Sequence, residues 1–147
     1  MNYEQVWAPL LKEFTIFSNS PRSEWQFGAA PSQLVDLVTT GQKTATSSYF
    51  PAYDFDKESV PPVGHLNLIL DDKLAPKVLT VNTKVTLQPY DQIGDDIAFL
   101  EGEGTRDLIY WRQVHEPFFT EVAQEIGQSF MPQDLIVTEY FKVLKIL

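Results

Sequence analysis

The feature that most constrains the fold is a run in which apolar and polar side chains alternate with one exception, Thr83. From Leu79 to Leu87 the odd positions are Leu, Val, Thr, Val and Leu, and the even positions are Thr, Asn, Lys and Thr. A period of two is typical of a β-strand with one face on a core. The apolar run 63–70 precedes it across the turn residues 71–73, and 135–147 reads as a terminal strand in a covered sheet. These runs, with an extended piece at 24–28, predict a mostly antiparallel sheet.

Helical spacing appears in three other regions. The first is 2–18, whose stripe is formed by Tyr3, Trp7, Leu10, Phe14 and Phe17. The second begins near Pro31, which suits a first helical turn, and ends at Gly41 as a left-handed cap. The third runs from about residue 105 to 126, with a kink or split expected at Pro117 because proline removes a helical hydrogen bond.

The remaining segments are shorter. Residues 51–62 contain three prolines and no clear period, so they predict an irregular connection beside the strand at 44–50. A short helix is expected at 97–100. No internal repeat or linker divides the chain, and we predict one α+β domain spanning 1–147. Its expected architecture is a small, curved, mostly antiparallel sheet or barrel flanked by about three helices.

Composition excludes several classes of function. Twenty acidic against eleven basic residues give a net charge of −9, and the lysines form no cluster. Proteins that grip duplex DNA need a basic stripe, so duplex DNA is not an expected partner. The chain has no cysteine, no signal-like start and no apolar run long enough to span a bilayer. We therefore expect a soluble, cytoplasmic protein with no membrane partner.

The most suggestive chemistry lies in Gly41-Gln42-Lys43-Thr44-Ala45-Thr46, where a helix is expected to pass into a strand. Because side chains alternate along a strand, Thr44, Thr46 and Ser48 share one face. A threonine hydroxyl is a weak nucleophile and needs a neighbouring base, and Lys43 could serve if it gave up its proton. The structural alternative is that the threonines are ordinary strand residues and that Lys43 meets the helix dipole.

Other candidates are spread along the chain. Glu101-Gly102-Glu103-Gly104 places two glutamates among glycines, which are expected where the backbone needs unusual dihedrals or a close approach. His115 lies on the apolar stripe of its helix, so a core or pocket-edge histidine is the main alternative to a ligand. Further candidate ligand-binding residues are Trp25 and Tyr53, which could stack on a base, and Arg112, which could reach a phosphate. With two histidines and no cysteine, neither a metal site nor a cofactor is expected.

Taken in order, several of these pieces resemble the ASCH domain family over roughly residues 25–146. The residues that carry the resemblance are Phe27-Gly28, Gly41 to Thr46, Pro62-Val63-Gly64, Glu101 to Gly104 and Tyr110 to Phe119. The resemblance implies a β-barrel similar to the PUA domain, a fold associated with RNA binding. Some relatives are thought to hydrolyse acylated cytidine nucleosides with a Lys, a Thr and a Glu, and a related member is described as a ribonuclease.

The resemblance carries catalytic roles onto Lys43, Thr46 and Glu103, with Glu101 as second choice for the glutamate. Ligand-binding roles are expected for Glu101, Trp25, Phe27, Thr44, Ser48, Tyr53, Trp111, Arg112 and His115. The chain departs from the pattern in three places. Ser47-Ser48-Tyr49 follows Thr46 where the small hydrolases have an arginine, and Ala29 and His65 stand where longer relatives have aspartate.

The expected function is therefore a pocket for a nucleoside-like, nucleotide-like or RNA-like small ligand. An amidohydrolase acting on N-acylated cytidine-type nucleosides is one form of this function. The alternative is a non-catalytic module that binds a nucleotide or single-stranded RNA, and a ribonuclease is a weaker variant. The acidic charge favours a small ligand over extended RNA in each case.

Overall fold

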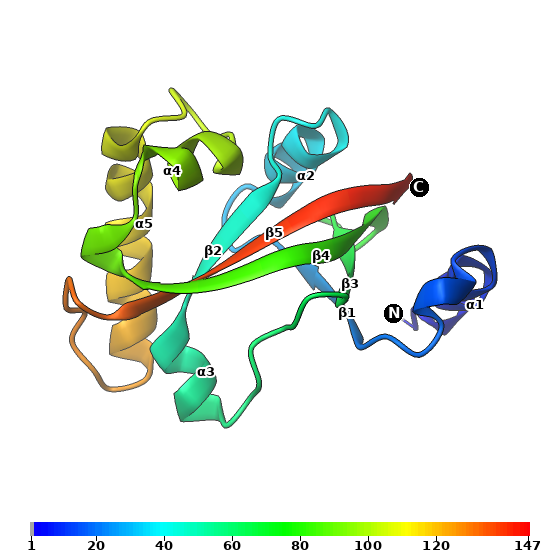
Figure 1. The fold of residues 1–147 in the computed structure, drawn as a ribbon, viewed down its shortest axis with the longest axis horizontal. Helices are drawn as coiled ribbons and strands as arrows, with labels where there is room; N and C mark the ends of the chain where they lie inside the picture. Colours follow the sequence, from blue (N-terminus) through cyan, green and yellow to red (C-terminus); the bar gives the residue numbers. More distant parts are fainter. Residues whose placement is uncertain (1) are drawn as a thin grey trace.

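The computed structural model describes residues 2–147 as a five-stranded mixed sheet that curls into a half-barrel (Figure 1). The order across the sheet is β1-β3-β4-β5-β2. The strands are β1 (Arg22–Gln26), β2 (Ala45–Tyr49), β3 (Leu66–Leu70), β4 (Pro76–Pro89) and β5 (Leu135–Ile146). β1 runs parallel to β3, and every other neighbouring pair is antiparallel. The predicted α+β, mostly antiparallel fold is confirmed, and the parallel edge strand is an addition to it.

Within residues 2–147, five α-helices accompany the sheet, more than the three or so expected. They are α1 (Glu4–Glu13), α2 (Pro31–Thr39), α3 (Phe50–Asp56), α4 (Asp95–Glu101) and α5 (Leu108–Glu125), with 3₁₀ turns at Thr15–Phe17 and Tyr90–Gln92. The N-terminal helix is thus shorter than 2–18 and finishes in a 3₁₀ turn. α5 continues through Pro117, so of the kink or split predicted there, the split does not occur.

The prediction of an irregular connection over 51–62 is wrong for its first half, where α3 forms. Pro51 lies in the first turn of α3, where a missing N–H leaves no helical hydrogen bond unmade. The prolines therefore do not exclude a helix at this position. Lys57 ends the helix in a left-handed conformation, and an extended segment without regular structure leads on to β3.

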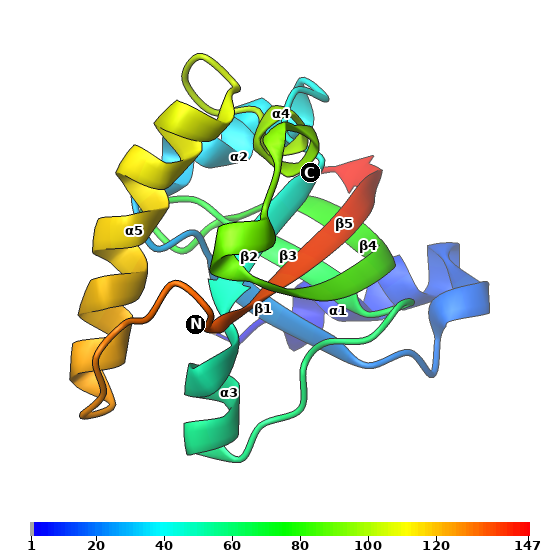
Figure 2. The same cartoon turned by 60° about the vertical axis from the view of Figure 1, so that its left-hand side comes forward.

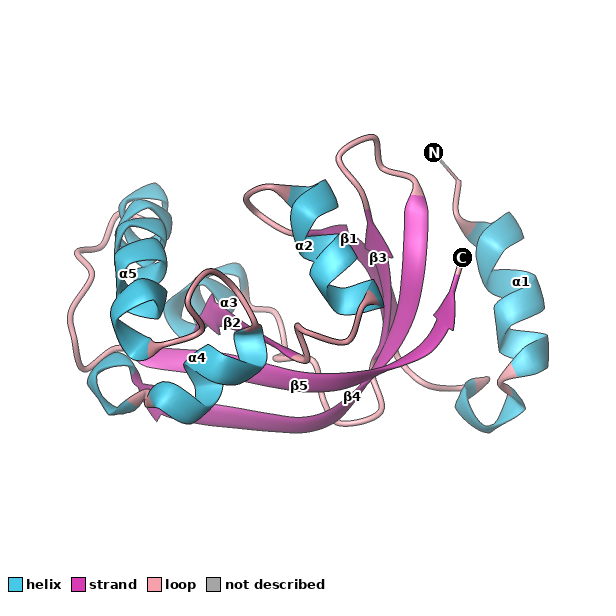
Figure 3. Ribbon diagram, turned by 90° about the horizontal axis from the view of Figure 1, so that it is seen from above, coloured by secondary structure: helices cyan, strands magenta, loops and turns pink. Residues whose placement is uncertain are grey.

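The helices cover both faces of the sheet (Figure 2). Leu66, Leu68 and Leu70 of β3 pack with Trp7 and Leu10 of α1. On the opposite face of the strand, Ile69 packs with residues of α2 and with Val78 of β4. This two-sided burial explains why every residue of β3 except Asn67 is apolar. Seen from above, α1 and α2 lie on opposite sides of the sheet, and α5 lies at the far end (Figure 3).

A third apolar cluster ties α4 and α5 to β2 and β5. Its members include Tyr49, Ile97, Trp111, Phe119 and Ile136. This packing holds the first turns of α5 next to the residues that precede β2, which is the region that the sequence singled out. Among residues 2–147, no helix is both long and apolar enough to cross a membrane.

Candidate functional site

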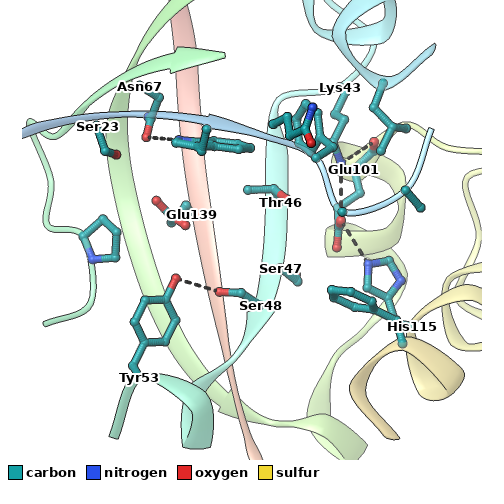
Figure 4. Close-up of a pocket in the computed structure, with 18 of the residues that line it drawn as sticks. Ser23, Lys43, Thr46, Ser47, Ser48, Tyr53, Asn67, Glu101, His115 and Glu139 are labelled. Atoms are coloured by element: carbon teal, nitrogen blue, oxygen red, sulfur yellow. Dashed lines mark hydrogen bonds and ion pairs between the residues drawn. The ribbon is translucent and has the colours of Figure 1, made fainter. Parts of the chain in front are cut away.

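A cavity of about 710 Å³ opens between the inner face of the sheet, the start of α2, the segment after α3, the end of α4 and α5 (Figure 4). That volume lies within the range of small-molecule sites, about 300–1,000 Å³. Nine of the sequence-predicted site residues line the cavity: Trp25, Phe27, Lys43, Thr46, Ser48, Tyr53, Glu101, Glu103 and His115.

Lys43 lies at one end of the cavity, with its side chain 1% exposed. Its Nζ donates to Oε2 of Glu103 at 2.9 Å and, more weakly, to Oε1 and the backbone oxygen of Glu101 at 3.4 and 3.3 Å. The face of the Phe27 ring is 5.3 Å from the same nitrogen. Lys43 is therefore an ammonium held between two carboxylates and against an aromatic ring.

The two glutamates differ in how far a ligand can reach them. The side chain of Glu101 is 2% exposed, whereas that of Glu103 is 18% exposed. Glu101 accepts a hydrogen bond from Nε1 of Trp111, and its Oε1 lies 3.3 Å from Nε2 of His115. Glu101 thus stabilises the cluster from its buried side, and Glu103 is the more accessible carboxylate at the cavity wall.

Within the cluster, interactions between opposite charges shift the pKa values in the direction opposite to the effect of burial. Burial alone would raise the pKa of Glu101, but Lys43 and then His115 outweigh it and lower that pKa to about 2. Burial alone would lower the pKa of His115, but the Glu101 carboxylate outweighs it and raises that pKa. Nδ1 of His115 donates to the backbone oxygen of Trp111 at 2.8 Å, which fixes the ring.

Steric contacts explain why position 102 in the Glu101–Gly104 segment is a glycine. Gly102 has φ +73°, and a Cβ there would lie 2.4 Å from the carbonyl oxygen of Gln42. The backbone can therefore approach closely, and Nε2 of Gln42 donates to the Gly102 oxygen at 2.6 Å. Thr44 N donates to the oxygen of Leu100 at 2.8 Å. These bonds join the end of α4 to the entry of β2 and bring both glutamates to Lys43.

Thr46 and Ser48 project from β2 into the same cavity (Figure 4). Oγ of Ser48 lies 3.1 Å from the hydroxyl of Tyr53, and burial raises the pKa of Tyr53. Within residues 2–147, no hydrogen bond joins Thr46 to Lys43. The lysine and threonine of the family pattern therefore share a cavity without direct contact.

Three predicted residues do not line the cavity. Thr44 has its Oγ1 3.5 Å from the Leu100 oxygen, and Arg112 is exposed on the surface of α5. Trp111 is buried behind Glu101 and stacks on His115 at a centroid distance of 4.2 Å. It supports the cluster from the core. In an amphipathic helix, the position next to a buried tryptophan tends to face solvent, which accounts for Arg112.

Sequence reasoning missed the polar groups at the other end of the cavity. Asn67 on β3 and Glu139 on β5 are buried and line it, as do Ser23 and His65. Nε2 of His65 lies 2.8 Å from Oγ of Ser23, and burial lowers the pKa of His65. The available signal was polar residues inside otherwise apolar strands, because a buried polar group needs a partner or a ligand.

Glu139 is the most unusual of these groups. Burial raises its pKa, and a hydrogen bond from Nδ2 of Asn82 at 2.9 Å offsets this only in part. Nδ2 of Asn67 donates to Oδ1 of Asn82 at 2.9 Å, and Nε1 of Trp25 donates to Oδ1 of Asn67 at 3.1 Å. Among residues 2–147, no group of three or more histidine, aspartate or glutamate side chains is placed to hold a metal ion.

Comparisons with known proteins find a matching family model and similar solved structures. A family model described as the ASCH domain matches residues 23–145. The crystal structure of an ASCH domain from Lactobacillus crispatus JV V101 is 31% identical, with a TM-score of 0.86 over 95% of this chain and 89% of that one. A crystal structure of a protein from Enterococcus faecalis V583 is 30% identical, with a TM-score of 0.87 over 97% and 88% of the two chains. A comparison with curated proteins finds no significant match.

Proposed function

The chain belongs to the ASCH domain family, with its PUA-like fold, and we propose that its cavity binds a small nucleoside-like molecule and hydrolyses an amide on it. The observation that carries this proposal is the position of Lys43. Its ammonium group lies 2.9 Å from Glu103 at the wall of a cavity that Thr46 also lines. A nucleophile-capable hydroxyl and a buried charge pair in one concave site are the features expected of an acyl-transfer centre.

The cavity supports a small, flat ligand. Trp25 and Phe27 form an edge-to-face pair with ring centroids 4.9 Å apart, and Tyr53 also lines the cavity. Heteroaromatic bases stack on such side chains. With a net charge of −9, the surface does not favour a long polyanion. A single nucleoside or a short single-stranded end is the preferred ligand class.

The residues have separate roles in the proposed reaction. Oγ1 of Thr46 is the nucleophile that attacks the amide carbonyl carbon. Lys43 is already paired to carboxylates, and as an ammonium it has three donors and no acceptor. All three donors point at oxygens of Glu101 and Glu103, so its role is to hold these carboxylates at the wall of the cavity. Glu103 is the more exposed of the two and is the one that a substrate can reach.

A non-catalytic binding module is the second candidate. Two observations favour it: Thr46 makes no hydrogen bond to Lys43 among the described residues, and serine rather than arginine follows Thr46. In that case the same aromatic walls and polar groups would hold a ligand without turnover.

The experiment is incubation of the protein with N4-acetylcytidine, with release of cytidine followed by chromatography. Thr46→Val and Glu103→Gln are expected to lower the rate by at least about 100-fold. Thr83→Val is the matched control, because Thr83 is an exposed threonine on β4 outside the cavity. A thermal-shift measurement with the same nucleoside separates the two candidates. Stabilisation without release of cytidine supports the binding module, and neither effect at high protein concentration refutes both.

A further inference from the structure

Glu139 and Thr46 are direct cross-strand neighbours. In the antiparallel pairing of β2 with β5, Thr46 is opposite Glu139. Side chains of opposite residues lie on the same face, with Cβ atoms about 4.5–5.5 Å apart. Both residues line the cavity, and Figure 4 shows them on adjacent strands between Asn67 and Lys43. No hydrogen bond joins the two side chains among the described residues, but this cross-strand spacing lets one water molecule connect the carboxyl group to the threonine hydroxyl.

A directed chain of hydrogen bonds orients this carboxyl group. It runs from Trp25 through Asn67 and Asn82 to Oε1 of Glu139, with donor–acceptor distances of 3.1, 2.9 and 2.9 Å. Each amide in the chain donates with its nitrogen and accepts with its oxygen, so both amide orientations are fixed. Oε2 of Glu139 accepts no hydrogen bond from residues 2–147 and is left for a group in the cavity.

Neither Lys43 nor Glu103 is free to accept the proton of Thr46 in the proposed reaction. Lys43 donates toward three oxygens of Glu101 and Glu103, so its nitrogen has no lone pair to offer. Glu103 is already engaged by that ammonium group at 2.9 Å. Within the described residues, Glu139 is not paired with any cation.

We propose that Glu139 is the general acid–base residue that serves Thr46, an inference that rests on the proposed amide hydrolysis. Glu139 takes the proton of Thr46 Oγ1 as this oxygen bonds to the amide carbonyl carbon. The C–N bond then breaks, and Glu139 gives the proton to the leaving nitrogen. Water attacks the resulting Thr46 ester, Glu139 accepts a proton from that water, and the proton returns to Oγ1 as the C–O bond breaks. The products are a carboxylic acid and the free amine.

The surroundings suit this role. A general base works best when its pKa lies near the working pH, and burial moves the pKa of Glu139 upward in that direction. The titratable groups that line the cavity with it are Tyr53, Glu58 and His65 near its own end, and Lys43, Glu101, Glu103 and His115 at the other. Burial and the Asn82 hydrogen bond are the two influences that shift the pKa of Glu139, and none of these neighbours shifts it clearly.

The test is the pH profile of N4-acetylcytidine hydrolysis by wild-type protein and by Glu139→Gln. The amide oxygen of the substituted side chain can still accept from Asn82, so folding and binding are preserved. We expect kcat to fall by about 100-fold or more with KM changed less than about threefold, and the loss of rate at acidic pH to disappear. Glu121→Gln, an exposed carboxylate on α5, is the control and keeps wild-type activity. Formate is expected to restore part of the activity of Glu139→Ala by occupying the vacated space.

The outcomes separate the inference from the proposed function. If the wild-type protein hydrolyses the substrate and Glu139→Gln keeps more than half of kcat with the same pH profile, the inference is wrong and the proposed function stands. If the wild-type protein releases no cytidine, both are overturned. If Glu139→Gln does not fold, Glu139→Asp decides: a retained acidic limb with reduced kcat supports the role, and unchanged kcat refutes it.

Discussion

Replacing Lys43 with methionine would remove a buried positive charge while keeping a chain of similar length. Glu101 would then stay fully buried, with Trp111 and His115 as its remaining partners. Breaking a buried ion pair by removing one partner costs about 3–5 kcal/mol, because the other charge stays uncompensated. His115, with its Nε2 3.3 Å from Glu101, keeps part of the compensation. We therefore expect a loss near the lower limit, about 3 kcal/mol at pH 7.

The direction in which this loss of stability changes with pH can also be predicted. In the wild-type protein the pKa of Glu101 is lowered from 4.5 to about 2. Its stabilising contribution is therefore complete above pH 4.5 and is lost as the pH falls toward 2. In Lys43→Met the strongest influence that lowers this pKa is gone, and burial raises it. At lower pH Glu101 becomes neutral in the variant and His115 becomes fully protonated, and both changes reduce the destabilisation caused by the unpaired Glu101 charge. The difference in stability between the two proteins should shrink between pH 7 and pH 5.

Urea unfolding followed by tryptophan fluorescence measures this difference. Lys145→Met is the matched control, because Lys145 pairs with Glu13 at 2.8 Å on the surface, where both side chains are more than 40% exposed. Such a pair contributes about 1 kcal/mol or less. The double variant Lys43→Met/Glu101→Gln should recover at least half of the loss, since no buried charge is left unpaired. Equal small losses for the two lysine variants would refute the coupling described for the site.

Three further outcomes follow from the geometry. Gly102→Ala should destabilise the protein by about 2–5 kcal/mol in urea, because its Cβ would lie 2.4 Å from the Gln42 oxygen and φ is +73°. In an NMR titration His115 should ionise above 6.5 and His65 below it, since Glu101 raises the first pKa and burial lowers the second. The His115 contribution to stability is present below pH 6.5 and is lost as the pH rises through its folded pKa. Asn82→Ala should cost about 1–3 kcal/mol, measured by urea unfolding, because the side chains it bonds lose a partner.

Local pattern was enough to predict most of the fold. The helical stripe at 105–126 identified α5 because one face of that helix is buried. Period-two alternation identified β4, although residues 78–82 of this strand are buried on both faces. The parallel pairing of β1 with β3 was not predictable, since it is decided by packing between distant segments. α3 was missed because the prolines of 51–62 were taken as breakers, although only Pro51 lies in this helix and a proline in the first turn is tolerated.

The candidate site, like the fold, could be predicted from the sequence only in part. Lys43, Thr46 and the glutamates could be found because they lie in short segments with glycines that need special backbone geometry. Glu139 could not, because its partner Thr46 is brought opposite it only by the pairing of β2 with β5. Nor did any local pattern show that Lys43 and Thr46 would share a cavity without a hydrogen bond between them.

The two ends of the cavity differ in charge, and this difference favours one kind of ligand. At the first end Lys43 and His115 offset the charges of Glu101 and Glu103, so little net field is left for an anion. At the second end Glu139 has no cationic partner among residues 2–147. A phosphate there would meet a carboxyl group without compensation, whereas a ring N–H or amino group would find an acceptor. The charge arrangement therefore supports the ligand class that we propose, an uncharged heterocycle with N–H donors, over the backbone of a nucleic acid.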